Sequence, residues 1–292
     1  MPKLNERSAR AIERLRAFGT PETNYFQVPV KKRAAVLYLL FADKHGDLRV
    51  IVTIRSSNLN SFPGHAALPG GRADSEAETP FQTARREANE EIGLPGIGTP
   101  LPSPFSIEHL CEFPCVVSVT DIAVRPCVAF LHSYNEKTGE DADAEEAFMP
   151  QLDAKEVAAV FSARFHNFLS SEDEVFDETE RRELPGQPRD WYHGYWAEHN
   201  GPWRMHNFYV PITNQRITKS RRLSVSSTEG TDSNLSPEER AKVLEKKHLW
   251  VDAARIAFDE EPQFDYNKKL GEEHVLREFL ASGRFEKAKA RH

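Results

Sequence analysis

The chain has 292 residues, 39% hydrophobic and 28% charged, which fits a folded globular protein longer than one typical domain. Its formal net charge of −7 gives no overall attraction to polyanions, so a general nucleic-acid binder is disfavoured and any phosphate site must be a local basic patch. No apolar run approaches the length of a membrane span and the first residues lack the apolar core of a signal peptide, so neither a membrane protein nor a secreted one is expected.

The three cysteines are odd in number and include no Cys-x-x-Cys pair. They stand at Cys111, Cys115 and Cys127. We therefore expect buried free thiols in a reducing compartment rather than disulfides or a zinc site.

The first predicted elements are a helix and a β-hairpin. Residues 4–18 place apolar side chains at roughly helical spacing and are followed by Gly19 and Pro21, which predicts a helix that ends there. Residues 34–41 form a continuous apolar run, and after a polar turn residues 48–54 form a second one. This pattern predicts two paired strands, one of them central in a sheet.

Residues 55–71 follow the hairpin and are rich in Gly, Pro and small polar residues, which predicts a loop. Arg55 and Ser56 at its start are suited to donate hydrogen bonds to phosphate oxygens. An ordinary salt bridge at the strand end is the alternative for Arg55. Gly70 and Gly71 at the end of the loop would let the backbone pass close to phosphate groups.

Residues 80–92 carry signals for both ends of a helix. Thr79 is a favourable N-cap, Pro80 suits the first helical position, and Gln82 completes a Thr-x-x-Gln capping box. Gly93 then offers a stop at the C-terminal end. The segment therefore predicts a helix with defined ends.

Three glutamates share one face of this helix, because Glu87, Glu90 and Glu91 stand at positions i, i+3 and i+4. Their mutual repulsion and the helix dipole both disfavour bare carboxylates in the C-terminal half of a helix. A hard divalent cation, Mg²⁺ or Mn²⁺, would offset this charge through carboxylate oxygens. The alternative is a solvated acidic face paired with Arg85 and Arg86, which the spacing alone would favour.

Further strands are expected at residues 115–119 and 122–131, followed by an acidic turn. Residues 156–161 predict another strand that continues into residues 165–169. Glu156 at the start of this strand has two interpretations. It is either an additional metal ligand or base, or an ordinary surface glutamate at a strand end.

The last part of the chain is expected to contain an aromatic hairpin, an insertion and two helices. Aromatic residues gather in residues 191–196 and 203–210, where a packed hairpin or a dimer contact is favoured over a platform that stacks an adenine. Residues 216–236 are rich in Ser and Thr and predict a flexible insertion. Capping signals predict a helix over residues 237–258, and a final helix covers about residues 271–281.

The predicted acidic helix and the segment before it resemble the Nudix box of the Nudix hydrolases. That motif consists of a Gly, a spaced Glu and then Arg-Glu-aliphatic-x-Glu-Glu-x-Gly-aliphatic. The matching residues are Arg86-Glu87-Ala88-Asn89-Glu90-Glu91-Ile92-Gly93-Leu94, preceded by Glu78 and by Gly70-Gly71. There are two departures, since Ala88 is a minimal aliphatic residue and six residues rather than five separate Gly71 from Glu78. The extra residue falls in the loop before the helix, so the carboxylate face is expected to be undisturbed.

Residues 53–71 are similar to the additional signature of the coenzyme A diphosphatase branch of this family. That signature is an aliphatic-Thr-x-Arg-Ser segment followed by a spaced Gly and Phe-Pro-Gly-Gly. In this chain Asn60 stands where the signature usually has Arg, and Leu68 replaces Phe. Within the branch the closest likeness is to the fungal peroxisomal enzymes, and residues from about 34 to 169 resemble the family well.

The resemblance implies an α/β (α+β) chain with the Nudix fold, a mixed β-sheet sandwiched between helices. The expected organisation is an N-terminal helical extension at residues 1–25, a Nudix domain at 26–215, the insertion at 216–236 and C-terminal helices at 237–292 that pack on the domain. The resemblance also implies that Arg86 orients the box carboxylates and that Glu78 braces the loop. The implied metal ligands are Glu87, Glu90 and Glu91, the catalytic set adds Arg86 and Glu156, and the substrate-binding set is Arg55, Ser56, Gly64, Gly70 and Gly71.

The implied activity is metal-dependent hydrolysis of the pyrophosphate of coenzyme A and its derivatives to 3′,5′-ADP and (acyl-)4′-phosphopantetheine. A diphosphatase for oxidised nucleotides such as 8-oxo-dGTP is an alternative, because it needs the same phosphate chemistry. A non-catalytic Nudix module that binds a nucleotide or a protein is an alternative of a different class.

The expected partner is a small nucleotide of the coenzyme A type, with no nucleic acid and no membrane, and a homodimer is left open. A peroxisomal location is implied by the resemblance. A cytoplasmic one is the alternative, because Ala290-Arg291-His292 is not a Ser-Lys-Leu-type signal.

Overall fold

The computed structural model describes residues 4–56, 65–118, 120–135, 137–152, 157–172, 191–198, 202–211, 216–217, 240–245, 249–266 and 270–287. Its helices are α1 (Glu6–Phe18), α2 (Pro80–Ile92), α3 (Leu249–Phe258), α4 (Glu273–Ala281) and α5 (Arg284–Lys287). Short helical turns are η1 (Tyr25–Gln27), η2 (Val30–Lys32), η3 (Ala144–Phe148), η4 (Met149–Gln151) and η5 (His166–Leu169). The strands are β1 (Arg33–Ala42), β2 (Leu48–Ile54), β3 (Ala66–Ala67), β4 (Gly70–Arg72), β5 (Ser106–Glu112), β6 (Val116–Val117), β7 (Ala123–His132), β8 (Ala159–Arg164), β9 (Tyr192–Glu198), β10 (Pro202–Pro211), β11 (Arg216–Ile217) and β12 (Arg240–Glu245).

The described strands form a nine-stranded mixed sheet and a three-stranded one. In the larger sheet the order is β11-β8-β2-β1-β7-β5, while β3 pairs with β2, β4 with β1 and β6 with β7. The central pair, β1 and β7, is parallel. The hairpin of β1 and β2 is antiparallel, as the sequence predicts. The smaller sheet has the order β12-β10-β9.

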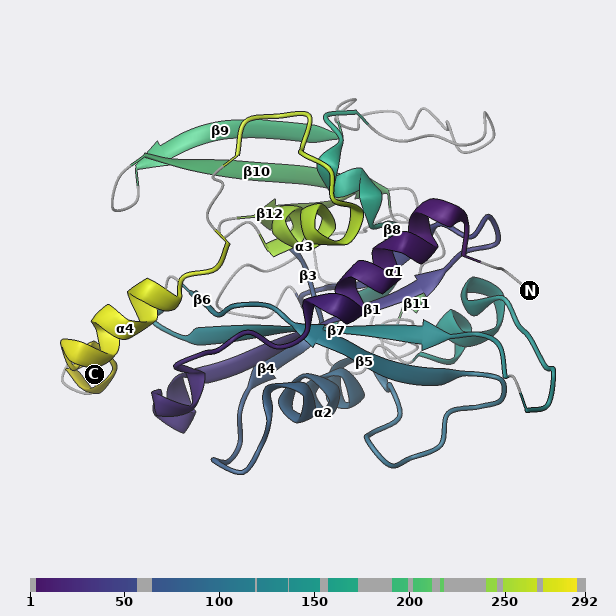
Figure 1. Cartoon of the computed structure of the whole chain (residues 1–292), viewed down its shortest axis with the longest axis horizontal. Coiled ribbons are helices and arrows are strands. Elements are labelled where there is room, and N and C mark those ends of the chain that lie inside the picture. The colour runs from purple at the N-terminus through teal and green to yellow at the C-terminus, as the bar shows by residue number, and fades with distance from the viewer. Residues whose placement is uncertain are drawn as a thin grey trace, which may run out of the picture.

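Helices cover both faces of the large sheet, which confirms the predicted sandwich (Figure 1). The helix α2 lies on one face, α1 and α3 lie on the other, and the small sheet lies beyond α3 (Figure 1). Because side chains of a strand alternate between its faces, β1 contributes to two cores. Leu37 and Leu39 belong to the core under α2, whereas Tyr38 and Leu40 belong to the core under α1 and α3.

The N-terminal helix and the two hairpin strands lie within two residues of their predicted positions. Residues 156–161 were expected to form a strand that continues to residue 169, but β8 covers Ala159–Arg164 and the chain then turns into η5. The strand prediction for residues 165–169 is therefore wrong. The reason is packing, since Phe165 and Phe168 are fully buried in the core that includes Trp250.

The predicted helix over residues 237–258 is wrong in its first half. Residues Arg240–Glu245 form β12, which pairs with β10, and among the described residues of this range the helix covers Leu249–Phe258. Sheet pairing has therefore overridden the local capping signals. Residues Arg216–Ile217, expected to open a flexible insertion, pair with β8 instead, and residues 218–239 lie outside the described residues.

The aromatic segment is a packed hairpin, as the favoured interpretation has it. Strands β9 and β10 pair in antiparallel register. The ring of Phe208 lies 5.6 Å from that of Trp191 and 5.1 Å from that of Phe168, which in turn stacks on Trp250 at 4.8 Å. Aromatic contacts of this kind fix the small sheet against η5 and α3.

A buried arginine joins the two ends of the described chain. Arg125 on β7 is completely buried, and its Nε donates to Glu112 Oε2 at 2.9 Å while its Nη2 donates to the Pro21 carbonyl at 2.9 Å. Its Nη1 lies 3.5 Å from Glu273 Oε1 on α4. Glu273 in turn accepts from Thr23 Oγ1 at 2.6 Å. We call these five residues the terminal junction.

The start of α4 also completes the edge of β6. The backbone of Glu272 donates to the Cys115 carbonyl at 2.7 Å, and its carboxylate accepts from the Val117 N–H at 2.7 Å. All three cysteines are buried and free, as predicted. Among the described residues there is no helix long and apolar enough to cross a membrane.

Candidate active site

The helix α2 begins and ends where the sequence predicts. Thr79 accepts from the Gln82 N–H at 3.2 Å and Gln82 Oε1 accepts from the Thr79 N–H at 2.9 Å, so both halves of the capping box are present. Gly93 adopts the left-handed conformation at φ 69° that favours glycine. Ala88 is fully buried in the core shared with β1, so a minimal aliphatic residue fits the space between helix and sheet. These features fix the helix that bears the acidic residues.

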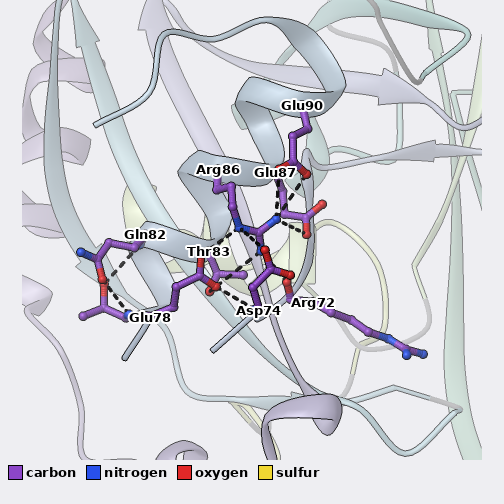
Figure 2. A network of polar contacts seen from close by, with 9 residues as sticks. Arg72, Asp74, Glu78, Gln82, Thr83, Arg86, Glu87 and Glu90 are labelled. Atoms are coloured by element: carbon purple, nitrogen blue, oxygen red, sulfur yellow. Dashed lines mark hydrogen bonds and ion pairs between the residues drawn. The ribbon is translucent and has the colours of Figure 1, made fainter. Parts of the chain in front are cut away.

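The guanidinium of Arg86 lies at the centre of the acidic cluster (Figure 2). Its Nε donates to Glu78 Oε1 at 2.8 Å, and its Nη2 donates to the Arg72 carbonyl at 2.7 Å. Its Nη1 lies 3.0 Å from Glu87 Oε1 and 3.2 Å from Glu90 Oε2. One cation therefore holds carboxylates from the loop and from two positions of the helix.

The carboxylate of Glu78 is fixed from three directions. Besides Arg86, it accepts from the Asp74 N–H at 2.9 Å and from Thr83 Oγ1 at 3.1 Å (Figure 2). Burial alone would raise the pKa of Glu78, but the hydrogen bonds from these three groups outweigh it and the pKa lies below its usual value. Glu78 is therefore an anionic link between the loop and α2, and its role as a brace of the site stays a prediction.

The two glycines of β4 contact the carboxylates of Glu87 and Glu91. The Gly70 N–H donates to Glu91 Oε2 at 3.0 Å. A Cβ on Gly71 would lie 2.4 Å from the carboxyl carbon of Glu87, so this carboxylate occupies the space that a side chain at residue 71 would need. The close backbone approach expected at Gly70 and Gly71 is thus made to the acidic side chains of the helix.

The acidic cluster holds more negative charge than Arg86 balances. Burial raises the pKa of Glu87, Arg86 lowers it in part, and the charges of Glu90 and Asp74 raise it further, with a net increase. Within the described residues no group of three or more His, Cys, Asp or Glu side chains is placed so that it could hold a metal ion as it stands. The donors are all carboxylate oxygens, the ligand type that Mg²⁺ and Mn²⁺ prefer, and a divalent cation would offset the surplus charge. The ligand type of Glu87, Glu90 and Glu91 suits such an ion, and their assignment as its ligands stays a prediction.

The other predicted site residues lie next to the segment that precedes Gly70 and Gly71, or outside the described residues. Arg55 and Ser56 follow β2, and the Arg55 N–H donates to the His65 carbonyl at 3.0 Å. Since His65 directly precedes β3, these two residues lie next to the segment that leads into the glycines. Gly64 and Glu156 are not among the described residues.

Two residues of the cluster, Thr83 and Asp74, make contacts that the sequence does not predict. The Thr83 hydroxyl and the Asp74 backbone both hold Glu78, and the Asp74 carboxylate lies 3.3 Å from Arg86 Nε. Thr83 stands five residues after Glu78, a spacing with no motif of its own. Only the path of the loop before α2 brings the two side chains together.

Comparison with known proteins places this cluster in a family. Residues 31–165 match the NUDIX domain. The chain is 36% identical over 159 residues to a peroxisomal coenzyme A diphosphatase of Saccharomyces cerevisiae, which covers 51% of this chain and 46% of that protein. It is 38% identical over 152 residues to the mitochondrial Nudix hydrolase 15 of Arabidopsis thaliana, with coverage of 51% and 46%.

A third relative is the peroxisomal coenzyme A diphosphatase NUDT7 of Mus musculus, 32% identical over 124 residues, with coverage of 42% of this chain and 44% of that protein. The chain thus spans about half the length of the curated relatives it matches. The matched region contains the whole acidic cluster with its glycines and Arg86. Residues 31–165 therefore match the NUDIX domain, and over this region the chain is similar to Nudix hydrolases.

Proposed function

We propose that the chain is a metal-dependent diphosphatase that hydrolyses the pyrophosphate of coenzyme A and its derivatives. The products would be 3′,5′-ADP and 4′-phosphopantetheine, or its acyl form. Two relatives, from Saccharomyces cerevisiae and Mus musculus, are named coenzyme A diphosphatases, which supports this substrate class.

The observation on which the proposal depends is the acidic cluster around Arg86. Glu87 and Glu90 share this guanidinium, and Glu91 is held by the Gly70 N–H next to them. Carboxylates so arranged on one rigid helix suit a cation that in turn binds a pyrophosphate. Arg55 and Ser56, at the end of β2, are close enough in the fold to the approaching loop to be proposed as substrate contacts.

In the proposed reaction a water attacks one phosphorus of the pyrophosphate, and the bond from that phosphorus to the bridging oxygen breaks. A bound Mg²⁺ or Mn²⁺ would neutralise the phosphate charge and lower the pKa of the water. Glu87, Glu90 and Glu91 would hold this ion, and Arg86 with Glu78 would keep the first two oriented. One of the box glutamates or Glu156 would accept the proton of the water.

The proposal is tested by incubating the full chain and Mg²⁺ or Mn²⁺ with coenzyme A, oxidised coenzyme A, ADP-ribose, NADH and 8-oxo-dGTP. We expect coenzyme A species to be cleaved best, with 3′,5′-ADP as a product. Glu90→Gln keeps the shape of the side chain but removes its charge, so it should lower the rate about 100-fold or more. Glu76→Gln is the matched control, because Glu76 is an exposed residue of the preceding loop.

Each outcome separates one part of the proposal from the rest. Preferred cleavage of 8-oxo-dGTP would retain the site and overturn the substrate. Equal rates for Glu90→Gln and the unchanged chain would overturn the metal site. Absence of metal-dependent cleavage of every substrate would favour a nucleotide- or protein-binding module instead.

A peroxisomal location is part of the proposal, since two of the three relatives named above are peroxisomal and the third is mitochondrial. Two fluorescent fusions, one to the N-terminal end of the chain and one to the C-terminal end, would test this location. Co-localisation with a peroxisomal marker is expected, and a cytoplasmic or mitochondrial signal would contradict it.

A further inference from the structure

Thr83 is a buried hydroxyl residue with one partner in the acidic cluster. It lies in the first turn of α2 after the capping box and is fully inaccessible to solvent. Its Oγ1 donates to Glu78 Oε2 at 3.1 Å, and Figure 2 shows it on the side of Glu78 that faces the helix. A buried hydroxyl is stabilised by such a bond, and a carboxylate with this partner is restricted to one orientation.

The orientation of Glu78 decides where Arg86 lies. The two strongest anchors of the guanidinium are Glu78 Oε1 at 2.8 Å and the Arg72 carbonyl at 2.7 Å. Its contacts with Glu87 and Glu90 are longer, at 3.0 Å and 3.2 Å. A cation that draws these two carboxylates away would therefore leave Arg86 held by Glu78 and the loop.

We propose that Thr83 is a positioning residue of the metal site, which acts by fixing Glu78 and through it Arg86, Glu87 and Glu90. The inference rests on the proposed function, because it takes these glutamates as ligands of a divalent cation. Groups that hold the ligands rather than the ion commonly change metal affinity or activity about 10-fold to 100-fold when they are removed. Arg86 is such a group, and Thr83 acts on it through Glu78.

The competing explanation is that Thr83 only stabilises the beginning of α2. Thr79 provides the comparison, since its side chain caps the same helix and makes no bond to Glu78. Thr79→Ala should destabilise the helix by loss of the cap and leave the carboxylates in place. Any effect that is due to helix stability alone must therefore appear in both variants.

The experiment measures Mn²⁺ affinity of the full chain by isothermal titration without substrate, together with thermal unfolding. Thr83→Val keeps the shape but removes the hydroxyl, and should weaken Mn²⁺ binding about 10-fold. Thr83→Ser keeps the hydroxyl and should restore the affinity to within about twofold of the unchanged chain. Thr79→Ala should lower the unfolding temperature with unchanged affinity.

A second comparison tests the route through Glu78. In a Glu78→Ala background, which removes the acceptor of the Thr83 hydroxyl, Thr83→Val should add little to the loss of affinity, because residues that act through one contact are not additive. Full additivity of the two changes would overturn the proposal. So would Mn²⁺ binding by folded Thr83→Val that equals that of the unchanged chain, or an equal loss in Thr79→Ala.

The readout also separates this inference from the proposed function. If the chain binds Mn²⁺ but cleaves no coenzyme A species, the substrate proposal fails while the affinities still decide the role of Thr83. If the unchanged chain binds no Mn²⁺, both proposals fall.

Discussion

At the scale of single residues, the site depends on space as much as on charge. Gly71 has no side chain, and the carboxylate of Glu87 lies where its Cβ would be, at 2.4 Å from the carboxyl carbon. Contacts this short are not found for real Cβ atoms, so either β4 or Glu87 must move if a methyl group is added. Because β4 is paired with β1, the glutamate side chain is the part that can yield.

Gly71→Ala is accordingly expected to displace Glu87 and to reduce the metal-dependent rate about 10-fold or more, with a smaller effect on unfolding temperature. Gly96→Ala is the matched control, because the nearest atom to its Cβ would be 4.0 Å away. Comparison of initial rates and of thermal unfolding for the two variants checks this. Wild-type activity in Gly71→Ala would show that the position of Glu87 is not critical.

The residues of the site were only partly predictable. Glu87, Glu90 and Glu91 stand out in the sequence because helical spacing places them on one face and a motif surrounds them. Thr83 and the Arg72 carbonyl give no such signal, since their contacts with Glu78 and Arg86 are made across a loop whose path the sequence does not specify. Backbone groups in particular are the same in every residue, so their roles emerge only from the fold.

At the scale of elements, predictions succeeded where local interactions decide. The N-terminal end of α2 depends on Thr79 and Gln82, and its C-terminal end on Gly93. Each of these residues makes its contacts within about one turn of its own end of the helix. The same kind of signal failed for residues 240–245, where pairing with β10 outweighs the expected helix. The edge strand β5 was missed because its first residues are largely polar and partly exposed, so they lack the apolar pattern of a buried strand.

The helix α3 contains a carboxyl group whose burial has a measurable consequence. Asp252 is buried, and this burial, partly offset by Arg255 at 3.7 Å, raises its pKa from 3.8 to about 7. Since the folded state then binds this proton more tightly than the unfolded state, the contribution of Asp252 to stability is greatest at low pH and falls as pH rises from about 4 to about 7. The full linkage for about three pKa units is at most about 4 kcal/mol.

Asp252→Asn removes this titration while keeping the shape of the side chain. We expect the variant to be more stable than the unchanged chain at about pH 8, with little difference at about pH 4. Urea unfolding at several pH values measures this, with exposed Asp265→Asn as the control. A pH dependence identical to that of the unchanged chain would contradict the assignment to Asp252.

At the scale of the whole molecule, the terminal junction joins parts of the chain that are far apart in sequence. Arg125 on β7, which is itself fully buried, contacts Glu112 on β5, the Pro21 carbonyl and Glu273 on α4. Sequence spacing does not predict contacts of this kind, because nothing in the sequence around Glu273 indicates that it pairs with a residue near position 23. Its carboxylate nevertheless accepts bonds from Thr23, Asn24 and Cys115.

Loss of the Glu273 charge should weaken the contacts of the terminal junction and the hydrogen bond from the Cys115 N–H beside β6. Burial would raise the pKa of Glu273, but its hydrogen bonds and Arg125 lower it overall, so its contribution is present above its ordinary pKa and is lost on acidification. Glu273→Gln is expected to cost about 1 to 3 kcal/mol at neutral pH. Urea unfolding tests this against exposed Glu278→Gln, which should change stability by less than about 0.5 kcal/mol. Equal values for the two variants would refute it.

The contact between Thr23 and Glu273 also bears on how the protein is made. The two residues are 250 positions apart, so on a ribosome the strands, α2 and its glutamates are all synthesised well before the carboxylate that the N-terminal segment and β6 require. The helix α2 can be in place while the edge of the sheet still has unpaired N–H groups at Cys115 and Val117. Exposed strand edges of this kind favour association with other chains. A chaperone would therefore be needed most while residues 272–273 of the nascent chain are still on the ribosome.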